Sequence, residues 1–118
     1  MTFNSSNYLQ ILENISKYST KNVKMVAVSK NHSVESIKTA INSGIRVFGE
    51  NRVQEAEKKF TNLKSKFQNI ELHLTGPLQT NKVKNAIKIF DLFQTLDREK
   101  LAKEFSKHTE SIKNKIFF

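Results

Sequence analysis

Cysteine and tryptophan are absent from this chain of 118 residues, which also contains a single proline and three glycines. Without cysteine, the chain has no disulfide framework, no thiolate metal site and no cysteine nucleophile. The glycines, Gly44, Gly49 and Gly76, cannot form a G-x-G-x-x-G motif or a P-loop. No apolar run reaches the ~20 residues of a membrane-spanning helix. The N-terminal residues lack the basic and apolar regions of a signal peptide, so we expect a cytoplasmic protein.

Acidic residues are also scarce, with 11 Asp+Glu against 20 Lys+Arg and a net charge of +9. All but three of the basic residues are lysine, and they are spread over every segment. Such a surface can attract nucleic acid or anionic ligands over long distances. Dispersed lysines nevertheless lack the bidentate arginines and interleaved aromatic residues that read bases. We therefore expect no specific nucleic-acid partner. The three histidines show no metal-ligand spacing, and no serine lies in a G-x-S-x-G motif.

Short apolar runs alternate with amphipathic stretches along the whole chain, without a linker or a domain boundary. Single helices between strands require parallel pairing through right-handed crossovers. An open doubly wound sheet and a (β/α)8 TIM barrel both begin in this way, and the missing nucleotide motifs weaken the first alternative. The expected strands are 23–29, 45–49, 70–75, 91–96 and a stub at 115–118, and the expected helices are 4–19, 33–44, 51–67, one from 80 or 81, and one from 97.

Lys30 follows the first of these strands, at the end of the apolar run that begins at Met25. A lysine at the mouth of an apolar layer is partly desolvated, which disfavours its charged form. A neutral lysine amine can form a Schiff base with a carbonyl compound or with pyridoxal phosphate. A lysine that extends from the strand end into water is the commoner explanation for this stretch taken alone.

Side-chain alternation places Lys30 on the same face of the sheet as Val28, and places His73 on the face opposite Leu72 and Leu74. His73 could contact a ligand there or could be a core histidine with a local partner. The other strands also end in polar or small residues, among them Asn51, Gly76 and Asp97. Ligands bind at such carboxyl ends in parallel α/β proteins, but helix N-caps fall at the same positions.

Four strand-exit segments together resemble the pyridoxal phosphate homeostasis proteins, which are YggS/PROSC-type members of the alanine racemase N-terminal-domain superfamily. The motifs occur in the order and at the spacing of that family, over nearly the whole chain. They are Ala27-Val-Ser-Lys30, Phe48-Gly-Glu-Asn-Arg-Val-Gln-Glu55, His73-Leu-Thr-Gly-Pro-Leu-Gln-Thr-Asn-Lys82 and Thr95-Leu-Asp-Arg98.

The resemblance implies a (β/α)8 barrel that binds pyridoxal 5′-phosphate, with Lys30 as the lysine of the internal aldimine. It also implies that Asn51, His73 and Gly76 line the cofactor, and that no residue is catalytic, because the family has no established turnover. Its members are thought to carry or buffer pyridoxal phosphate inside the cell. Residues 1–118 would form the N-terminal half of the barrel domain, with about four βα units and a strand stub.

Members of that family are about twice as long as this chain. The resemblance implies that the residues that bind the cofactor phosphate lie in the second half of those proteins, to which nothing in this chain corresponds. We therefore expect an incomplete barrel with impaired cofactor binding. Its first and fourth strands would have unpaired edges, and the chain could associate with itself through them. Two alternatives remain open. The chain could be a degenerate gene fragment without function, or it could be related in activity to the pyridoxal-phosphate-dependent amino-acid racemases.

Overall fold

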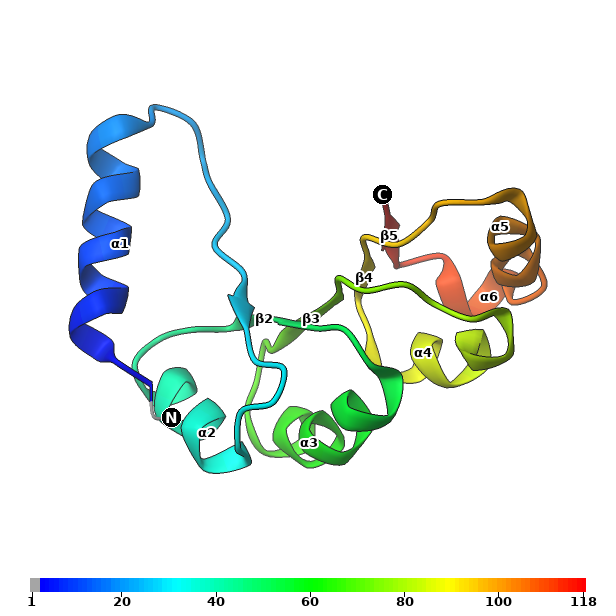
Figure 1. Ribbon diagram of the computed structural model, residues 1–118, viewed down its shortest axis with the longest axis horizontal. Coiled ribbons are helices and arrows are strands. Elements are labelled where there is room, and N and C mark those ends of the chain that lie inside the picture. The colour runs from blue at the N-terminus through cyan, green and yellow to red at the C-terminus, as the bar shows by residue number, and fades with distance from the viewer. Residues whose placement is uncertain (1–2) are drawn as a thin grey trace.

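The computed structural model describes residues 3–118 as an α/β fold built on one five-stranded sheet (Figure 1). Within these residues, no helix combines the length and the apolar character needed to cross a membrane. The elements, in chain order, are α1 (Ser5–Tyr18), β1 (Ala27–Val28), α2 (Val34–Asn42), β2 (Val47–Glu50), α3 (Val53–Lys66), β3 (Glu71–Leu74), the 3₁₀ helix η1 (Thr80–Lys82), α4 (Val83–Ile89), β4 (Leu92–Phe93), α5 (Glu99–Ser106), α6 (Thr109–Ile112) and β5 (Ile116–Phe117).

All five strands are parallel and lie in the order β1-β2-β3-β4-β5, so each strand pairs with its neighbour in the sequence. The prediction of an α/β fold with a parallel sheet is therefore confirmed. The expected strand stub is a paired strand, because Ile116 and Phe117 of β5 lie in register with β4. The edges of the sheet are consequently β1 and β5, and the expectation of an unpaired fourth strand was wrong.

Two predicted helix caps also differ from the structure. The residue preceding α3 is Arg52 and the residue preceding α5 is Arg98, and neither makes a side-chain capping bond. Asn51 and Asp97, which were considered as caps, are therefore not N-caps; the Asp97 carboxylate instead accepts a hydrogen bond from Arg98 at 2.7 Å. Ser33, the first residue of the expected helix 33–44, is the N-cap of α2, since its side chain accepts a hydrogen bond from the Ser36 backbone amide.

The hydrophobic core lies between the sheet and the helices that follow its strands. Helices α2, α3, α4 and α5 lie along one side of the sheet (Figure 1). The side chains of the central strands that face them, Phe48, Leu72, Leu74 and Phe93, are fully buried, as expected from alternation for Leu72 and Leu74. At the β5 end, Phe93 stacks on Phe117 at 5.2 Å between ring centroids, and Phe105 meets both rings edge-on. These aromatic contacts hold the last strand against the sheet.

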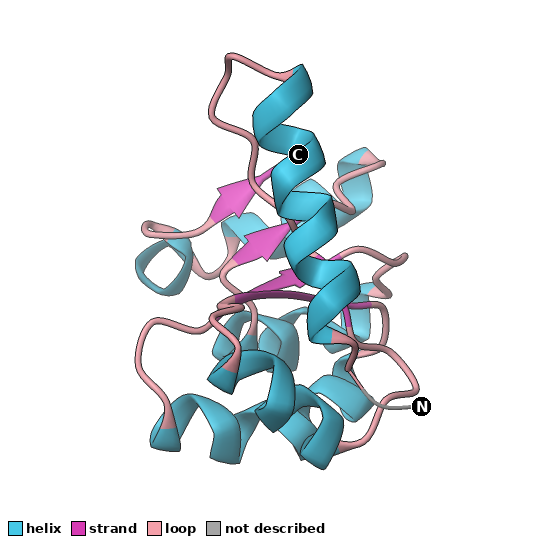
Figure 2. Cartoon of the chain, turned by 90° about the vertical axis from the view of Figure 1, so that its left-hand side faces the viewer, coloured by secondary structure: helices cyan, strands magenta, loops and turns pink. Residues whose placement is uncertain are grey.

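The opposite face of the sheet is open near β1. Val28, which points away from the helices, is 55% exposed. Helix α1 stands apart from the sheet (Figure 1) and crosses in front of the strands when it faces the viewer (Figure 2). It buries none of its residues, although it carries apolar side chains such as Leu9 and Leu12. It is connected to the body through Phe3 and Tyr8, whose ring centroids are 5.7 Å apart. Helices thus cover one side of the sheet, whereas apolar side chains stay exposed at β1 on the opposite face and on α1.

Candidate functional site

Lys30 lies in a tight turn directly after β1, where it is exposed to solvent. The turn is closed by the His32 amide, which donates to the Ser29 carbonyl at 3.0 Å. Asn31 adopts the left-handed conformation, with φ of 64°, as the third position of a type II turn requires. The partial desolvation expected for Lys30 is therefore absent, and its amine is accessible at the carboxyl edge of the sheet.

Asn51 and Gly76 lie in direct contact where β2 and β3 end. A Cβ atom built on Gly76 would lie 2.7 Å from the Asn51 Cβ and 2.8 Å from the Asn51 carbonyl oxygen. Both distances are shorter than real carbon contacts allow, so only glycine fits at position 76 with this backbone. The structure thus brings together two of the four predicted cofactor-binding residues, and the packing of the two strand ends explains the glycine.

His73 is 2% exposed and lies on the side of β3 opposite Leu72 and Leu74, where alternation predicted it. Its Nδ1 accepts a hydrogen bond from the Gln94 side-chain amide at 3.1 Å. The ring proton therefore lies on Nε2, which donates to the Glu71 carboxylate at 2.9 Å. The sequence left two alternatives for His73, a ligand contact or a core histidine with a local partner. Because both ring nitrogens have protein partners, His73 is a core histidine of the second kind.

Glu71 connects this histidine to the first strand segment. Its carboxylate also accepts a hydrogen bond from the Lys24 ammonium at 2.8 Å. Burial disfavours the ionised carboxylate, but the hydrogen bonds from Lys24 and His73 outweigh it, so the pKa of Glu71 lies below its ordinary value. The side of the sheet away from the helices therefore carries a polar row, Lys24–Glu71–His73–Gln94, which links the segment before β1 to β3 and to the residue that follows β4.

A buried ionic cluster on the helix side of the sheet escaped the sequence-based prediction. Glu50 is fully buried at the end of β2, and its Oε2 lies 2.9 Å from the Lys59 ammonium of α3. Lys59 also contacts the Glu55 carboxylate at 2.8 Å. The sequence did contain a usable signal, since Glu50 is in phase with the core residue Phe48 and a carboxylate in that position needs a cation.

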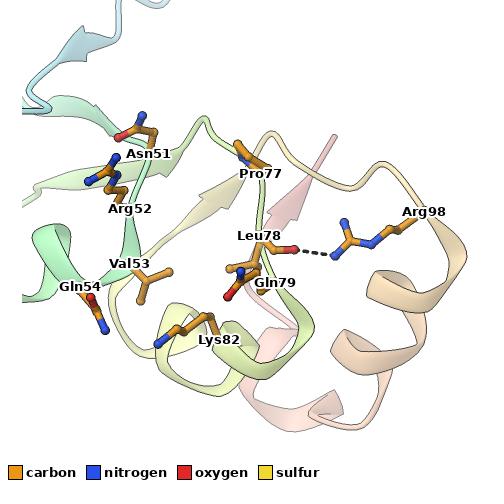
Figure 3. Close-up of a pocket in the computed structure, with 9 residues that line it drawn as sticks. All are labelled: Asn51, Arg52, Val53, Gln54, Pro77, Leu78, Gln79, Lys82 and Arg98. Atoms are coloured by element: carbon orange, nitrogen blue, oxygen red, sulfur yellow. Dashed lines mark hydrogen bonds between the residues drawn. The ribbon is translucent and has the colours of Figure 1, made fainter.

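A cavity of about 570 Å³ opens at the ends of β2 and β3, in front of α3 and η1 (Figure 3). Three basic side chains line it, and one of them, Arg98, donates a hydrogen bond to the Leu78 carbonyl at 2.7 Å. Lys30 does not line this cavity, whereas Asn51 does. Its lining consists of Asn51, Arg52, Val53, Gln54, Pro77, Leu78, Gln79, Lys82 and Arg98.

Comparison with known proteins identifies relatives of one kind, although no family model matches the chain. A protein of Buchnera aphidicola from Schizaphis graminum, named pyridoxal phosphate homeostasis protein, is 50% identical over 93 residues, which are 79% of this chain and 40% of that protein. A protein of the same name from Aquifex aeolicus is 43% identical over 93 residues, 79% of this chain and 39% of that protein. The solved structure of PipY from Synechococcus elongatus, with PLP bound, has a TM-score of 0.76 and 35% identity, covering 87% of this chain and 48% of PipY.

The chain belongs to the pyridoxal phosphate homeostasis protein family. This confirms the family that was inferred from the four strand-exit segments of the sequence. The chain spans less than half the length of the relatives it matches, in agreement with the expectation that it corresponds to part of their domain. A crystal structure of an unknown protein from Bifidobacterium adolescentis shares the fold, with a TM-score of 0.79 at 25% identity over 91% of this chain and 49% of that one.

The contact between Gly76 and Asn51 predicts that Gly76→Ala destabilises this member of the homeostasis family. The added methyl group meets the Asn51 backbone, which cannot rotate away, so we expect a loss of about 1–3 kcal/mol in urea unfolding. Gly49→Ala is the matched control, because its Cβ would meet only side-chain methyl groups of Val26 and Thr75 at 3.1 and 3.4 Å. Equal stability of the two variants would contradict this assignment.

The lowered pKa of Glu71 predicts a pH-dependent effect of Glu71→Gln. A carboxylate with a folded-state pKa below its unfolded value stabilises the protein above the unfolded pKa, and this contribution is lost as the pH falls through the folded pKa. The variant should therefore be less stable than wild type by about 1 kcal/mol at pH 7. The difference should shrink as the pH falls below the ordinary value of 4.5. Thermal melts between pH 3 and 7 test this, with the exposed Glu110→Gln as control; a difference independent of pH would contradict it.

Proposed function

We propose that this chain binds pyridoxal 5′-phosphate covalently at Lys30 and serves a non-catalytic role in the homeostasis of that cofactor. The observation that carries the proposal is the exposed amine of Lys30 at the carboxyl edge of a parallel sheet, in a chain up to 50% identical to named homeostasis proteins. The description of PipY as a PLP-bound structure supports the same cofactor. Ligands of parallel α/β folds bind at this edge.

The residues present fit this cofactor on one side of a pocket. Pyridoxal phosphate supplies an aldehyde, with which a lysine amine forms a C=N bond with loss of water. Lys30 offers that amine in an accessible turn, and the neighbouring Val28 offers exposed apolar surface on the open face of the sheet. Asn51 and Gly76 form the adjacent wall at the ends of β2 and β3. His73 contributes by holding β3 to β4, because neither ring nitrogen is free for the ligand.

Binding without turnover is the better reading of this site. Racemisation requires a second acid or base on the far side of the bound cofactor, and the described part of the chain offers no group there whose position supports that role. His73 has both nitrogens engaged in hydrogen bonds, and His32 lies in the same turn as Lys30, on the strand end that carries the attached lysine. We therefore assign Lys30 to cofactor attachment and no residue to catalysis.

We further propose that the fold is a sector of a (β/α)8 barrel. The strands follow one another in sequence order, whereas the order of a doubly wound sheet reverses at its switch point. The helices that connect the strands lie along one side (Figure 1), as they do on the outside of a barrel. The open face with Val28 would then be part of the barrel interior, and the groups that grip the cofactor phosphate would be supplied by the part of the barrel opposite it.

Covalent attachment predicts that one lysine among many reacts selectively. Pyridoxal phosphate should give a visible absorption band with the wild-type chain, and borohydride reduction followed by peptide mass mapping should place most of the label on Lys30. Lys30→Ala should lose the band and this label, whereas the exposed Lys21→Ala should keep both. Labelling of surface lysines at the same rate as Lys30 would refute specific binding.

The uncovered face and edges predict self-association of the isolated chain. Unpaired strand edges and exposed apolar surface favour pairing with another copy. Sedimentation equilibrium of the 118-residue chain should show dimers or larger species whose proportion rises with protein concentration. A Val28→Lys variant should shift the equilibrium toward monomer, because its added charge lies on the open face, while Lys113→Glu on an exposed loop should not. A strictly monomeric chain with a cooperative, heat-resistant melt would overturn the proposal.

A further inference from the structure

We propose that Lys59 is a positioning residue that fixes the turn bearing Lys30, and that Glu50 and Glu55 hold Lys59 in place. This inference rests on the proposed function of Lys30 as the site of cofactor attachment. Lys59 lies on α3, nearly 30 residues further along the chain, and its ammonium reaches through the core to the end of β1. Its role would be to set where the Lys30 amine stands, without touching the cofactor itself.

The contacts of Lys59 converge on the turn from both ends. Its ammonium donates to the Ser29 carbonyl at 2.8 Å and to the His32 carbonyl at 3.3 Å, which are the residues at the two ends of the turn. Lys30 and Asn31 are the residues between them. A single buried cation thereby links the start and the end of the segment, in addition to the turn's own bond from the His32 amide to Ser29.

Two carboxylates complete the arrangement. Glu50 Oε2 lies 2.9 Å from the Lys59 ammonium and also accepts a hydrogen bond from the Ser29 hydroxyl. Glu55 Oε2 lies 2.8 Å from the same ammonium and accepts a hydrogen bond from the Asn31 amide at 2.6 Å. Each carboxylate therefore contacts both Lys59 and a residue of the turn. We call this set, Ser29, Asn31, Glu50, Glu55 and Lys59, the turn clamp.

Burial makes the turn clamp rigid. Glu50 is fully buried and Lys59 nearly so, and a charge removed from water must be closely paired to remain in the fold. Among residues 3–118, the other carboxylate oxygen of Glu50, Oε1, finds no hydrogen-bond partner, so Lys59 and Ser29 provide the polar contacts of this ion. A displacement of the turn would break charge-assisted bonds, which are stronger than neutral ones. The Cα of Lys30 is consequently held at a defined place on the sheet edge.

This arrangement explains how one lysine can be preferred in a lysine-rich chain. All but three of the 20 basic residues are lysine, and many are exposed. An accessible amine is therefore not a distinguishing property of Lys30. Its distinguishing property is the fixed turn at the carboxyl edge, because a reacting group held in place avoids the entropic cost of finding its geometry. The turn clamp would supply this difference through residues that sequence reasoning did not single out.

The experiment compares labelling rates within the same molecule. The Lys30 amine adds to the aldehyde carbon of pyridoxal phosphate, the carbonyl oxygen leaves as water, and borohydride then donates a hydride that converts the C=N bond into a stable secondary amine. Peptide mass mapping at short reaction times measures the label on Lys30 and on the other lysines. The other exposed lysines serve as an internal reference, because they lie outside the turn clamp.

The main variant is the double substitution Lys59→Met with Glu50→Gln. Both members of the buried ion pair are neutralised together, because Lys59→Met alone would leave the Glu50 charge buried and unpaired. We expect the Lys30 labelling rate to fall about tenfold, while the other exposed lysines react as in wild type. Lys58→Met with Glu57→Gln is the matched control, with the same residue types on the same helix outside the turn clamp, and it should leave the selectivity unchanged.

Glu55→Gln provides a second variant that keeps the buried pair of Lys59 and Glu50. Glu55 is partly exposed, so its substitution is compatible with folding, and it weakens the contact with the Asn31 amide. The hydrogen bond from Lys59, followed by that from the Asn31 amide, holds the pKa of Glu55 below its ordinary value. Glu55 is therefore ionised at the pH of labelling, and replacing this charged acceptor with a neutral one should slow Lys30 labelling by about threefold.

The results separate this inference from the function on which it rests. If wild type labels Lys30 no faster than its other lysines, the proposed function fails and the inference fails with it. If wild type is selective and the folded variants, including Glu55→Gln, keep the same selectivity, Lys30 binds the cofactor but the positioning role is wrong. Circular dichroism of each variant establishes folding, and if the double variant unfolds, the rate measured for Glu55→Gln decides.

Discussion

The buried ammonium of Lys59 is the interaction on which the arrangement of the strand ends depends. It contacts Glu50 at the end of β2, Glu55 on its own helix and the carbonyls of Ser29 and His32 after β1. These oxygens come from three elements that a hydrophobic core alone would hold only approximately, because apolar packing is not directional. Hydrogen bonds to a buried charge impose geometry, and leaving such a charge unpaired costs several kcal/mol. The sheet edge is therefore ordered from the helix side.

The opposite side of the sheet is ordered by different means. Gly76 allows the ends of β2 and β3 to touch through the Asn51 backbone, and His73 joins β3 to β4 through Gln94. Both ring nitrogens of His73 already have protein partners, and the Gly76 contact leaves no room for a side chain. These residues therefore offer a ligand few free hydrogen-bonding groups. The open face thus contributes shape and apolar surface near Val28, while the group with accessible chemistry is the amine of Lys30. On the proposed function, the end of β1 supplies the reactive amine, and the ends of β2 and β3 form the adjacent wall of the site.

Sequence periodicity predicted the succession of elements and the parallel pairing, because apolar spacing records which face of each element is buried. It overestimated β1, since only Ala27 and Val28 pair with β2, and pairing at a sheet edge is not visible in an apolar run. Alternation placed His73 on the correct face, but its partner Gln94 directly follows another strand, β4, and strand register is a tertiary property. Lys59 was missed because a lysine on a helix usually reaches solvent; only the in-phase position of Glu50 with Phe48 indicated a buried cation.

The division between the two sides of the sheet has a consequence for a cofactor carrier. On the proposed positioning role, the place of Lys30 depends on the turn clamp, whose buried ion pair lies on the helix-covered side of the sheet. Formation of a C=N bond with loss of water is reversible, so a well-placed amine raises the rate of attachment without by itself preventing release. Retention requires contacts with the remainder of the cofactor, above all its phosphate, from groups across the open face. On the proposed function, selectivity for Lys30 and strength of binding are thus determined by different parts of the barrel, and a chain with one part should be selective but weak.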